Sequence, residues 1–239
     1  MLYTQKRQNQ GANKMNARKR KIPEILSIEE QKKLLNVFNT RYPTSLRNKA
    51  MVRIMLTAGL RLSEVINLKW SNINFKAGKL KVEEGKGRKD RQLWIGDDTL
   101  NLFGKWKGRQ KKVLEEKEEE NSDNLVFTTL TGNKLNSDNI RQMVYRYAKK
   151  CRIQEEITKH YRDKEGNKLP GTYKEKKVTP HTLRHTFATD LYKDTKDIRR
   201  VQKALGHADI STTMIYTHLV DKDLERDMKA QDKKFNLVK

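Results

Sequence analysis

The sequence predicts an α+β protein that is mostly helical and contains a small antiparallel β-sheet. Apolar residues recur at intervals of three and four along most of the 239 residues, which is the pattern of helices with one buried face. Between residues 80 and 95 the pattern changes to an alternation of apolar and polar residues around a glycine-containing turn, which is typical of a β-hairpin. The length is sufficient for one sizeable hydrophobic core with tails.

The first predicted helix begins after Ser27, because Ser27 and Glu30 form a capping box ahead of an apolar run with helical spacing. A second helix is expected over about 45–58 and a third over 61–70. The alternating segment that follows, with glycines at 85 and 87, then supplies the β-hairpin.

The middle of the chain continues the mixed pattern. A helix near 97–119 ends in an acidic run that we interpret as a solvated surface. A short strand at 124–129 and a helix near 136–150 follow. Residues 160–177 have the glycine, proline and charge content of a loop or an extended hairpin, and no function is predicted for them.

The C-terminal third is predicted to be helical. A Thr-Pro pair at 179–180 provides a cap and a first turn for a helix that runs through Leu191. The next helix ends at Gly206, and Asp209 can cap a further helix that contains Tyr216.

The charge of the chain indicates a large anionic partner. There are 53 lysines and arginines against 30 aspartates and glutamates, which gives a net charge of +23. Nucleic acid is therefore the first candidate. The single cysteine, Cys151, excludes an internal disulfide framework and a cysteine-based metal site. No apolar run approaches the roughly 20 residues that span a bilayer, so we expect a cytoplasmic protein with no membrane partner.

The composition divides the chain into three parts. Residues 1–22 hold seven basic residues and no acidic one, which predicts a flexible basic arm, with a leader of no function as the alternative. Residues 23–220 are expected to form the folded domain, and 221–239 a C-terminal helix or tail. Basic side chains of the arm and of the hairpin turn are the predicted nucleic-acid contacts: Arg18, Lys19, Arg20, Arg88, Lys89 and Arg91.

Tyr216 and the start of the helix before it suggest phosphate chemistry. A phenol that attacks phosphorus conserves the bond energy in a phosphotyrosine ester, although a tyrosine in an apolar helix is more often a core residue. His181 and Arg184 are three residues apart and share a face in the first turn of their helix, where free amide N–H groups favour phosphate.

A zinc site is the competing interpretation of the same helix. His181 and His185 are four residues apart, as in helical zinc motifs. Thr182, however, stands where a metallopeptidase motif has glutamate, and Arg184 would place a positive charge beside the metal. We therefore expect no metal.

Two further cations complete the candidate site. Arg61 follows a glycine at a break between two predicted helices, and Glu64, three residues later, can pair with it and fix its orientation. Lys86 lies between two glycines at the hairpin turn, where its ammonium group can approach a nucleic-acid strand. No Walker motif occurs, so no nucleotide cofactor is expected.

The ordered set of these motifs resembles the tyrosine recombinases, or phage integrases, which include bacterial and archaeal chromosome-dimer resolvases and mobile-element integrases. The matching fragments are "TAGLRLSE" with Arg61, "GKGRKDR" with Lys86, "HTLRH" with His181 and Arg184, "LGH" with His207, and "IYTHL" with Tyr216. Each fragment is modest, but their order and spacing over 57–219 are specific.

The resemblance implies a role for each matched residue. Tyr216 attacks the scissile phosphate of DNA and forms a 3′-phosphotyrosyl link, while Arg61 and Arg184 neutralise the phosphate. His207 donates a hydrogen bond to the phosphate, and Lys86 protonates the leaving 5′ oxygen. The resemblance also assigns the role of base toward the tyrosine proton to His181, and it implies no cofactor.

The resemblance further implies a homo-tetramer on two double-stranded DNA sites, in which residues 221–239 dock on a neighbouring subunit. Family members carry a separate helical DNA-binding domain, whereas only the basic arm precedes the folded domain here. A helper DNA-binding protein is therefore also an expectation. A type IB topoisomerase-like enzyme, which rejoins the original strand, and a non-catalytic DNA-binding protein remain the alternatives.

Overall fold

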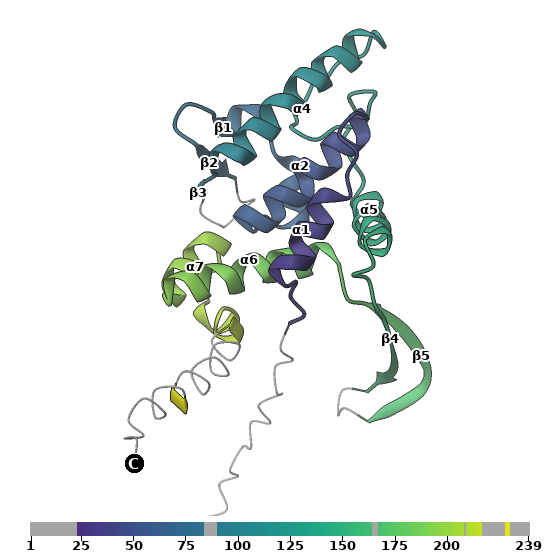
Figure 1. The fold of residues 1–239 in the computed structure, drawn as a ribbon, viewed down its shortest axis with the longest axis vertical. Helices are drawn as coiled ribbons and strands as arrows, with labels where there is room; N and C mark the ends of the chain where they lie inside the picture. The colour runs from purple at the N-terminus through teal and green to yellow at the C-terminus, as the bar shows by residue number, and fades with distance from the viewer. Residues whose placement is uncertain (1–22, 84–89, 164–166, 208, 217–227, 230–239) are drawn as a thin grey trace, which may run out of the picture.

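Helices form the larger part of the molecule, with a three-stranded sheet beside them and a two-stranded hairpin that projects away (Figure 1). The computed structural model describes residues 23–83, 90–163, 167–207, 209–216 and 228–229. The predicted α+β class is confirmed. None of the helices in these ranges is both long and apolar enough to cross a membrane.

The first three helices build one side of the core. They are α1 (Ile28–Asn36), α2 (Pro43–Ala58) and α3 (Leu62–Asn67). The predicted capping box is present, since the Ser27 hydroxyl accepts from the Glu30 amide at 3.2 Å and the Glu30 carboxylate accepts from the Ser27 amide at 2.8 Å. Helix α2 ends at Gly59, whose positive φ of 62° reverses the chain into α3.

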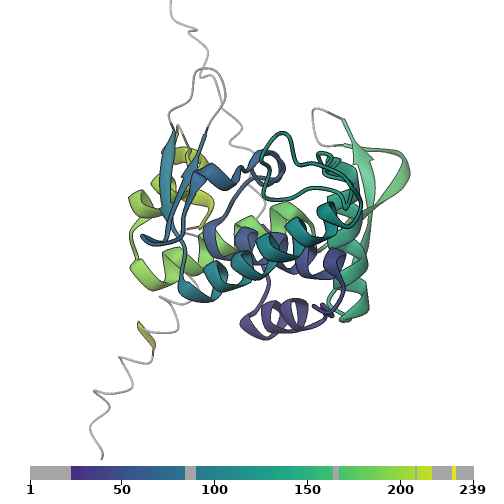
Figure 2. The same ribbon diagram turned by 90° about the horizontal axis from the view of Figure 1, so that it is seen from above.

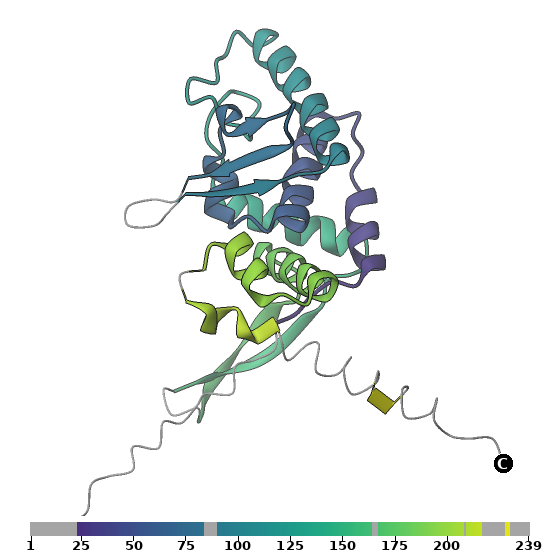
Figure 3. The same cartoon turned by 90° about the vertical axis from the view of Figure 1, so that its left-hand side faces the viewer.

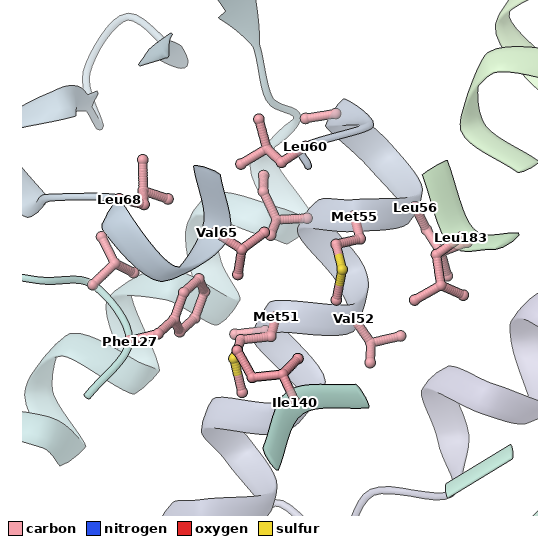
Figure 4. Packing of buried hydrophobic residues seen from close by; sticks show 14 of the residues in the cluster. Met51, Val52, Met55, Leu56, Leu60, Val65, Leu68, Phe127, Ile140 and Leu183 are labelled. Carbon is pink, nitrogen blue, oxygen red and sulfur yellow. The ribbon is translucent and has the colours of Figure 1, made fainter. Parts of the chain in front are cut away.

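Helix α2 is the centre of the fold. Its side chains are buried along most of its length, and Met51, Met55 and Leu56 pack with residues from other elements (Figure 4). Helix α4 (Asp97–Glu115) and helix α6 (Pro180–Thr195) both pack against α2. Because α2 contacts both partners, it fixes the position of α6, which carries candidate site residues.

The three-stranded sheet is antiparallel in the order β1-β2-β3. Its strands are β1 (Ile73–Asn74), β2 (Lys79–Val82) and β3 (Arg91–Trp94), preceded by the 3-10 helix η1 (Trp70–Asn72). Leu80 pairs with Leu93, and both point inward, as the predicted alternation requires. Figure 2 shows this sheet and the β4–β5 hairpin at opposite ends of the molecule.

The strand predicted at 124–129 is absent from the described part of the chain, where only isolated bridges occur at Leu125 and Thr128. Its backbone is bonded in other ways: the indole N–H of Trp106 donates to the Val126 carbonyl at 2.6 Å, and the Val126 amide donates to the Leu68 carbonyl at 2.7 Å. The segment is apolar because it is buried, and its backbone is satisfied without a partner strand.

Helix α5 (Ser137–Lys150) leads into the long hairpin of β4 (Glu156–Arg162) and β5 (Lys168–Lys176). Of the two predictions for this region, the structure selects the extended hairpin. The rings of Tyr161 and Tyr173 are 5.2 Å apart on it, and the hairpin projects beyond the layer of α6 and α7 (Figure 3).

The C-terminal part begins at α6, which Thr179 caps as predicted, its hydroxyl accepting from the Thr182 amide at 3.2 Å. The elements after α6 are α7 (Ile198–Leu205), η2 (Ile210–Thr212) and η3 (Met214–Tyr216). The helix predicted from Asp209 is thus two 3-10 turns, whose backbone bonds, such as that from the Tyr216 amide to the Thr213 carbonyl, close after three residues. Residues 221–239 lie outside the described ranges except for 228–229.

Candidate active site

A cleft of about 520 Å³ is lined by five of the six residues predicted to be catalytic. Its lining comes from the α2–α3 junction, α5, α6 and the segment after α7, and it includes Arg61, His181, Arg184, His207 and Tyr216. Side chains that are up to 155 positions apart in the sequence therefore meet at one cavity. The other predicted contacts on the arm and the hairpin turn lie outside the described residues: Arg18, Lys19, Arg20, Lys86, Arg88 and Lys89.

Arg184 is the most deeply held cation of the cleft, with 6% of its surface exposed. Its guanidinium donates to the Gly59 carbonyl and, at 2.7 Å, to the Leu205 carbonyl. Burial, with the repulsion of Arg61, lowers the pKa of Arg184 to about 10. The group therefore stays protonated at neutral pH, and its backbone partners aim it into the cleft.

Glu64 organises the second cation. Its carboxylate accepts from the Arg61 guanidinium at 2.7 Å and from the Arg61 amide at 2.7 Å. A further Arg61 nitrogen donates to the Gly206 carbonyl at 3.0 Å. The predicted pairing of Glu64 with Arg61 is thus present, and Glu64 holds both the backbone amide and the guanidinium of the arginine.

Arg91, which was predicted as a DNA contact, is buried against Glu64. The alternation along β3 turns this side chain inward, where two guanidinium nitrogens donate to Glu64 at 2.9 and 2.8 Å and a third donates to the Ala204 carbonyl at 2.9 Å. Burial alone would raise the pKa of Glu64, but the bonds and charge of Arg91, together with Arg61, lower it to about 2. Arg91 is a structural partner of the carboxylate.

His207 follows the left-handed cap of α7 at Gly206. Its Nδ1 lies 3.0 Å from the Thr213 hydroxyl and its Nε2 lies 3.3 Å from the Arg184 guanidinium. Burial first, and then the charges of Arg184 and Arg61, lower the pKa of His207 to about 4. Because a guanidinium only donates, the neutral ring accepts at Nε2 and keeps its proton on Nδ1.

Tyr216 is 1% exposed and belongs to a small core with Ala188, Val201 and Leu205. Its hydroxyl lies 2.8 Å from Nδ1 of His185, which also lines the cleft. Burial raises the pKa of Tyr216 to about 12, against the opposing charge of Arg184. The phenol is therefore protonated at neutral pH and must lose its proton during attack.

Sequence reasoning considered His185 only as a zinc ligand and missed its contact with the tyrosine. The two residues are 31 positions apart, and no pattern in the sequence links them. Burial, His181 and Arg184 lower the pKa of His185 to about 4. His181 lines the same cleft but is exposed, and burial followed by Arg184 and Arg141 lowers its pKa.

Helix α5 adds two residues that the sequence did not single out. Ser137 and Arg141 line the cleft, and the Arg141 guanidinium donates to the Ser137 hydroxyl at 3.1 Å. They stand near the N-terminal end of α5, where backbone amide groups favour anions.

This arrangement is suited to a tetrahedral phosphate. Three arginines and three histidines line a cleft whose wall holds a buried phenol. Guanidinium groups match the oxygens of a phosphate in geometry and charge, and the phenol supplies a nucleophile.

Comparison with known proteins gives an independent view of the family. Residues 24–223 match the model of the phage integrase family. The chain is 37% identical over 211 residues to tyrosine recombinase XerD of Halalkalibacterium halodurans, an alignment that covers 88% of this chain and 62% of the relative. The chain thus spans less than two thirds of that curated relative's length.

Solved structures show the same likeness. The crystal structure of XerA recombinase superposes with a TM-score of 0.67 at 29% identity and covers 89% of this chain and 66% of that one. XerH site-specific recombinase, bound to its palindromic difH substrate after cleavage, gives a TM-score of 0.66 at 26% identity, covering 89% of this chain and 54% of that one. The resemblance read from the motifs is confirmed, and the chain belongs to the phage integrase family.

Proposed function

We propose that this protein is a site-specific DNA recombinase or integrase that cuts and rejoins strands through a 3′-phosphotyrosyl intermediate, without metal or ATP. The single observation that carries the proposal is the cleft that unites Arg61, Arg184, His207 and Tyr216. The likeness to the tyrosine recombinase XerD and to the DNA-bound XerH supports the same activity.

In this mechanism the Tyr216 oxygen attacks the scissile phosphorus as the bond to the 5′ oxygen breaks. Arg184 and Arg61 stabilise the charge that accumulates on the non-bridging oxygens in the transition state. Both guanidinium groups are held by backbone carbonyls or by Glu64 before DNA binds. The electrostatic groups are therefore largely preorganised.

His207 supplies a further hydrogen bond to the phosphate. Its Nε2 faces Arg184, so donation to a phosphate requires the ring to gain a proton there or to change tautomer. The negative phosphate favours the added proton. The Thr213 hydroxyl, at 3.0 Å from Nδ1, keeps the ring in place in either state.

Lys86 is proposed as the acid that protonates the leaving 5′ oxygen. Strands β2 and β3, which precede and follow Lys86 in the chain, are anchored in the core by Leu80 and Leu93. The first residue of β3, Arg91, is bonded to Glu64, which also holds Arg61. The hairpin and the catalytic arginine are thereby linked through one carboxylate.

The proposed partner is double-stranded DNA, which suits the net charge of +23. We further propose that residues 1–22 act as a basic arm, that 23–220 form the catalytic domain, and that 221–239 dock on a neighbour in a homo-tetramer on two sites. A helper DNA-binding protein is proposed where this assembly needs additional affinity for its site.

Trapping of the covalent intermediate tests the activity. A pool of random duplexes with a nick near each candidate site is incubated with the protein, and adducts stable in SDS are isolated and sequenced. We expect the wild type to form such an adduct and Tyr216→Phe to form none while it binds DNA normally. Tyr192→Phe is a matched control, because Tyr192 packs on the same small core but does not line the cleft.

The recovered sequences then allow the outcome of rejoining to be tested. Two copies of the selected site on one plasmid should give recombined products. Relaxation of supercoils without joined sites would instead identify a topoisomerase-like enzyme. DNA binding with no adduct from the wild type would identify a non-catalytic protein and would overturn the proposal.

A further inference from the structure

The Tyr216 hydroxyl is held by a group that the matched motifs do not assign to catalysis. Nδ1 of His185 lies 2.8 Å from that oxygen, and the two rings are 5.8 Å apart at their centres. The resemblance implies that the base which accepts the Tyr216 proton is His181, which lies one turn earlier on α6. The hydrogen bond therefore points to His185, and not His181, as the acceptor of the Tyr216 proton.

His185 is in the protonation state that an acceptor requires. Its surroundings lower its pKa to about 4, so the ring is neutral near pH 7. With the phenol protonated, the bond places the phenolic hydrogen toward Nδ1 and leaves the ring's own hydrogen on Nε2. This tautomer can take a proton at one nitrogen and release one from the other.

A second cavity reaches the same residue from behind. Its volume is about 590 Å³, and it is lined by Pro23 and Glu24, by residues 173–177 at the base of the β5 strand, and by the start of α6. His181, His185 and Ile215 line both this cavity and the catalytic cleft. The histidines thus form the partition between them.

The partition gives a proton an exit on the side of His185 away from the catalytic cleft. A duplex seated on the catalytic cleft excludes water from the cleft side of His185. The second cavity is bordered by hydrophilic side chains of β5, among them Lys174, Glu175 and Lys176. Such a polar and roomy site can hold water.

We propose that His185 is a catalytic residue of the reaction described above, on which this inference rests: it accepts the Tyr216 proton at Nδ1 and releases a proton from Nε2 to water in the second cavity. As the phenolic O–H bond breaks, the N–H bond forms, and the freed oxygen pair makes the bond to phosphorus. The bond from phosphorus to the 5′ oxygen breaks, and that oxygen takes its proton from Lys86. Religation reverses each transfer.

The transfer is coupled to bond formation. A phenol with a raised pKa does not ionise onto a neutral imidazole of low basicity by itself. As its oxygen bonds to phosphorus it loses basicity, and the negative phosphate beside the ring stabilises the imidazolium. Ionisation of Tyr216 before a phosphate occupies the cleft is therefore suppressed.

Single-turnover cleavage of a suicide duplex tests this role. His185→Asn keeps an amide oxygen that can accept the tyrosine hydrogen bond but cannot take up its proton. We expect cleavage to slow by about 100-fold, the lower end of what general base catalysis contributes. His181→Asn should slow cleavage less, and His160→Asn, on the exposed hairpin and outside both cavities, should match the wild type.

A change of leaving group separates the base from the acid. In a duplex whose scissile 5′ oxygen is replaced by sulfur, the leaving group departs without a proton. We expect this substrate to restore cleavage by Lys86→Ala but not by His185→Asn. Restoration of His185→Asn by sulfur, or a His185→Asn rate within about threefold of the wild type, would overturn the proposal.

Imidazole rescue distinguishes proton transfer from a structural role. His185→Ala leaves a space that opens toward the second cavity, and added imidazole should restore its adduct formation. Rescue of His181→Ala but not His185→Ala would transfer the role to His181, and a slow His185→Asn with no imidazole rescue of His185→Ala would mean that His185 only packs. Absence of any adduct from the wild type would instead remove the proposed function itself.

Discussion

Two guanidinium nitrogens of Arg91 lie 2.9 and 2.8 Å from the two carboxylate oxygens of Glu64. This bidentate pair is buried, with 6% and 8% of the respective side chains exposed. The same carboxylate holds Arg61, and the two arginines also reach the carbonyls of Ala204 and Gly206 at the end of α7. One acidic residue therefore connects β3, α3 and the segment that carries His207.

Removal of Arg91 is expected to destabilise the fold and the site together. Arg91→Met leaves the buried Glu64 carboxylate with one cation fewer, and the loss of one partner of a buried ion pair costs about 3 kcal/mol or more. Urea unfolding measures the change. Lys111→Ala, which breaks an exposed pair with Glu115, should change stability by less than about 0.5 kcal/mol. Equal effects of the two substitutions would contradict this account of Arg91.

Gly59→Ala is expected to disturb Arg184 through the backbone. Gly59 has a φ of 62°, and an added Cβ would stand 2.2 Å from the Phe187 ring. The Gly59 carbonyl accepts from Arg184, so a shift of this turn misplaces the guanidinium. We expect a loss of stability above about 1 kcal/mol and slower adduct formation with nearly unchanged DNA binding.

The control for this prediction lies in α4. A Cβ at Gly104 meets nothing within 4 Å, so Gly104→Ala in a helix interior should stabilise the protein by roughly 0.5–1 kcal/mol. If Gly59→Ala cleaved DNA at the wild-type rate, the link between this turn and Arg184 would be refuted.

Stability is expected to fall as the pH drops from about 6.5 toward 4. The folded protein holds His185 and His207 at pKa values of about 4, below the ordinary value of 6.5 that applies to an unfolded chain. In that window the unfolded state binds more protons, so acidification favours unfolding. A second loss should follow as the pH falls from 4.5 toward 2, where Glu64 is protonated.

The urea midpoint measured between pH 7.5 and 4 tests this linkage. A double variant, His185→Asn with His207→Gln, should show a flatter dependence than the wild type. The comparison isolates the two rings from the general repulsion of a highly positive chain. The same slope in both proteins would mean that neither histidine is held neutral by the fold.

Deletion of residues 1–20 is expected to weaken DNA binding about equally for all sequences. The segment contains six lysines and arginines and no acidic residue, so it would bind phosphates, which carry no sequence information. The slope of log affinity against log salt should become shallower by about one for each phosphate that the arm neutralises in the intact protein. Unchanged affinity at low salt would show that the arm takes no part in binding.

Local signals in the sequence predict much of the fold. The caps at Ser27 and Thr179 depend on residues three positions apart, and the alternation along β2 and β3 depends on neighbours, so both are readable without a structure. The pairing of Arg61 with Glu64 is local for the same reason. The resemblance to the family implies that the motifs meet at one site, and the cleft is lined by five of the six residues to which the resemblance gives a role.

The features that the sequence does not predict depend on contacts between residues far apart in the chain. Arg91 looked like part of a basic turn, but its partners are 27 and 113 positions away. His185 contacts Tyr216 across 31 positions, and the backbone of residues 124–129 is bonded to Trp106 of α4 and to the Leu68 carbonyl, contacts that no strand pattern reveals. In each case tertiary packing sets the contacts of the residue, and local composition does not predict them.

The most direct test of the central claim is to identify the amino acid that becomes joined to DNA. Adducts from the suicide duplex are digested with protease and nuclease, and the linked peptide is sequenced by mass spectrometry. We predict a single linkage from the 3′ phosphate to the oxygen of Tyr216, with a free 5′-hydroxyl on the released strand. A linkage to any other residue, or through a 5′ phosphate, would contradict the assignment of this cleft as the active site.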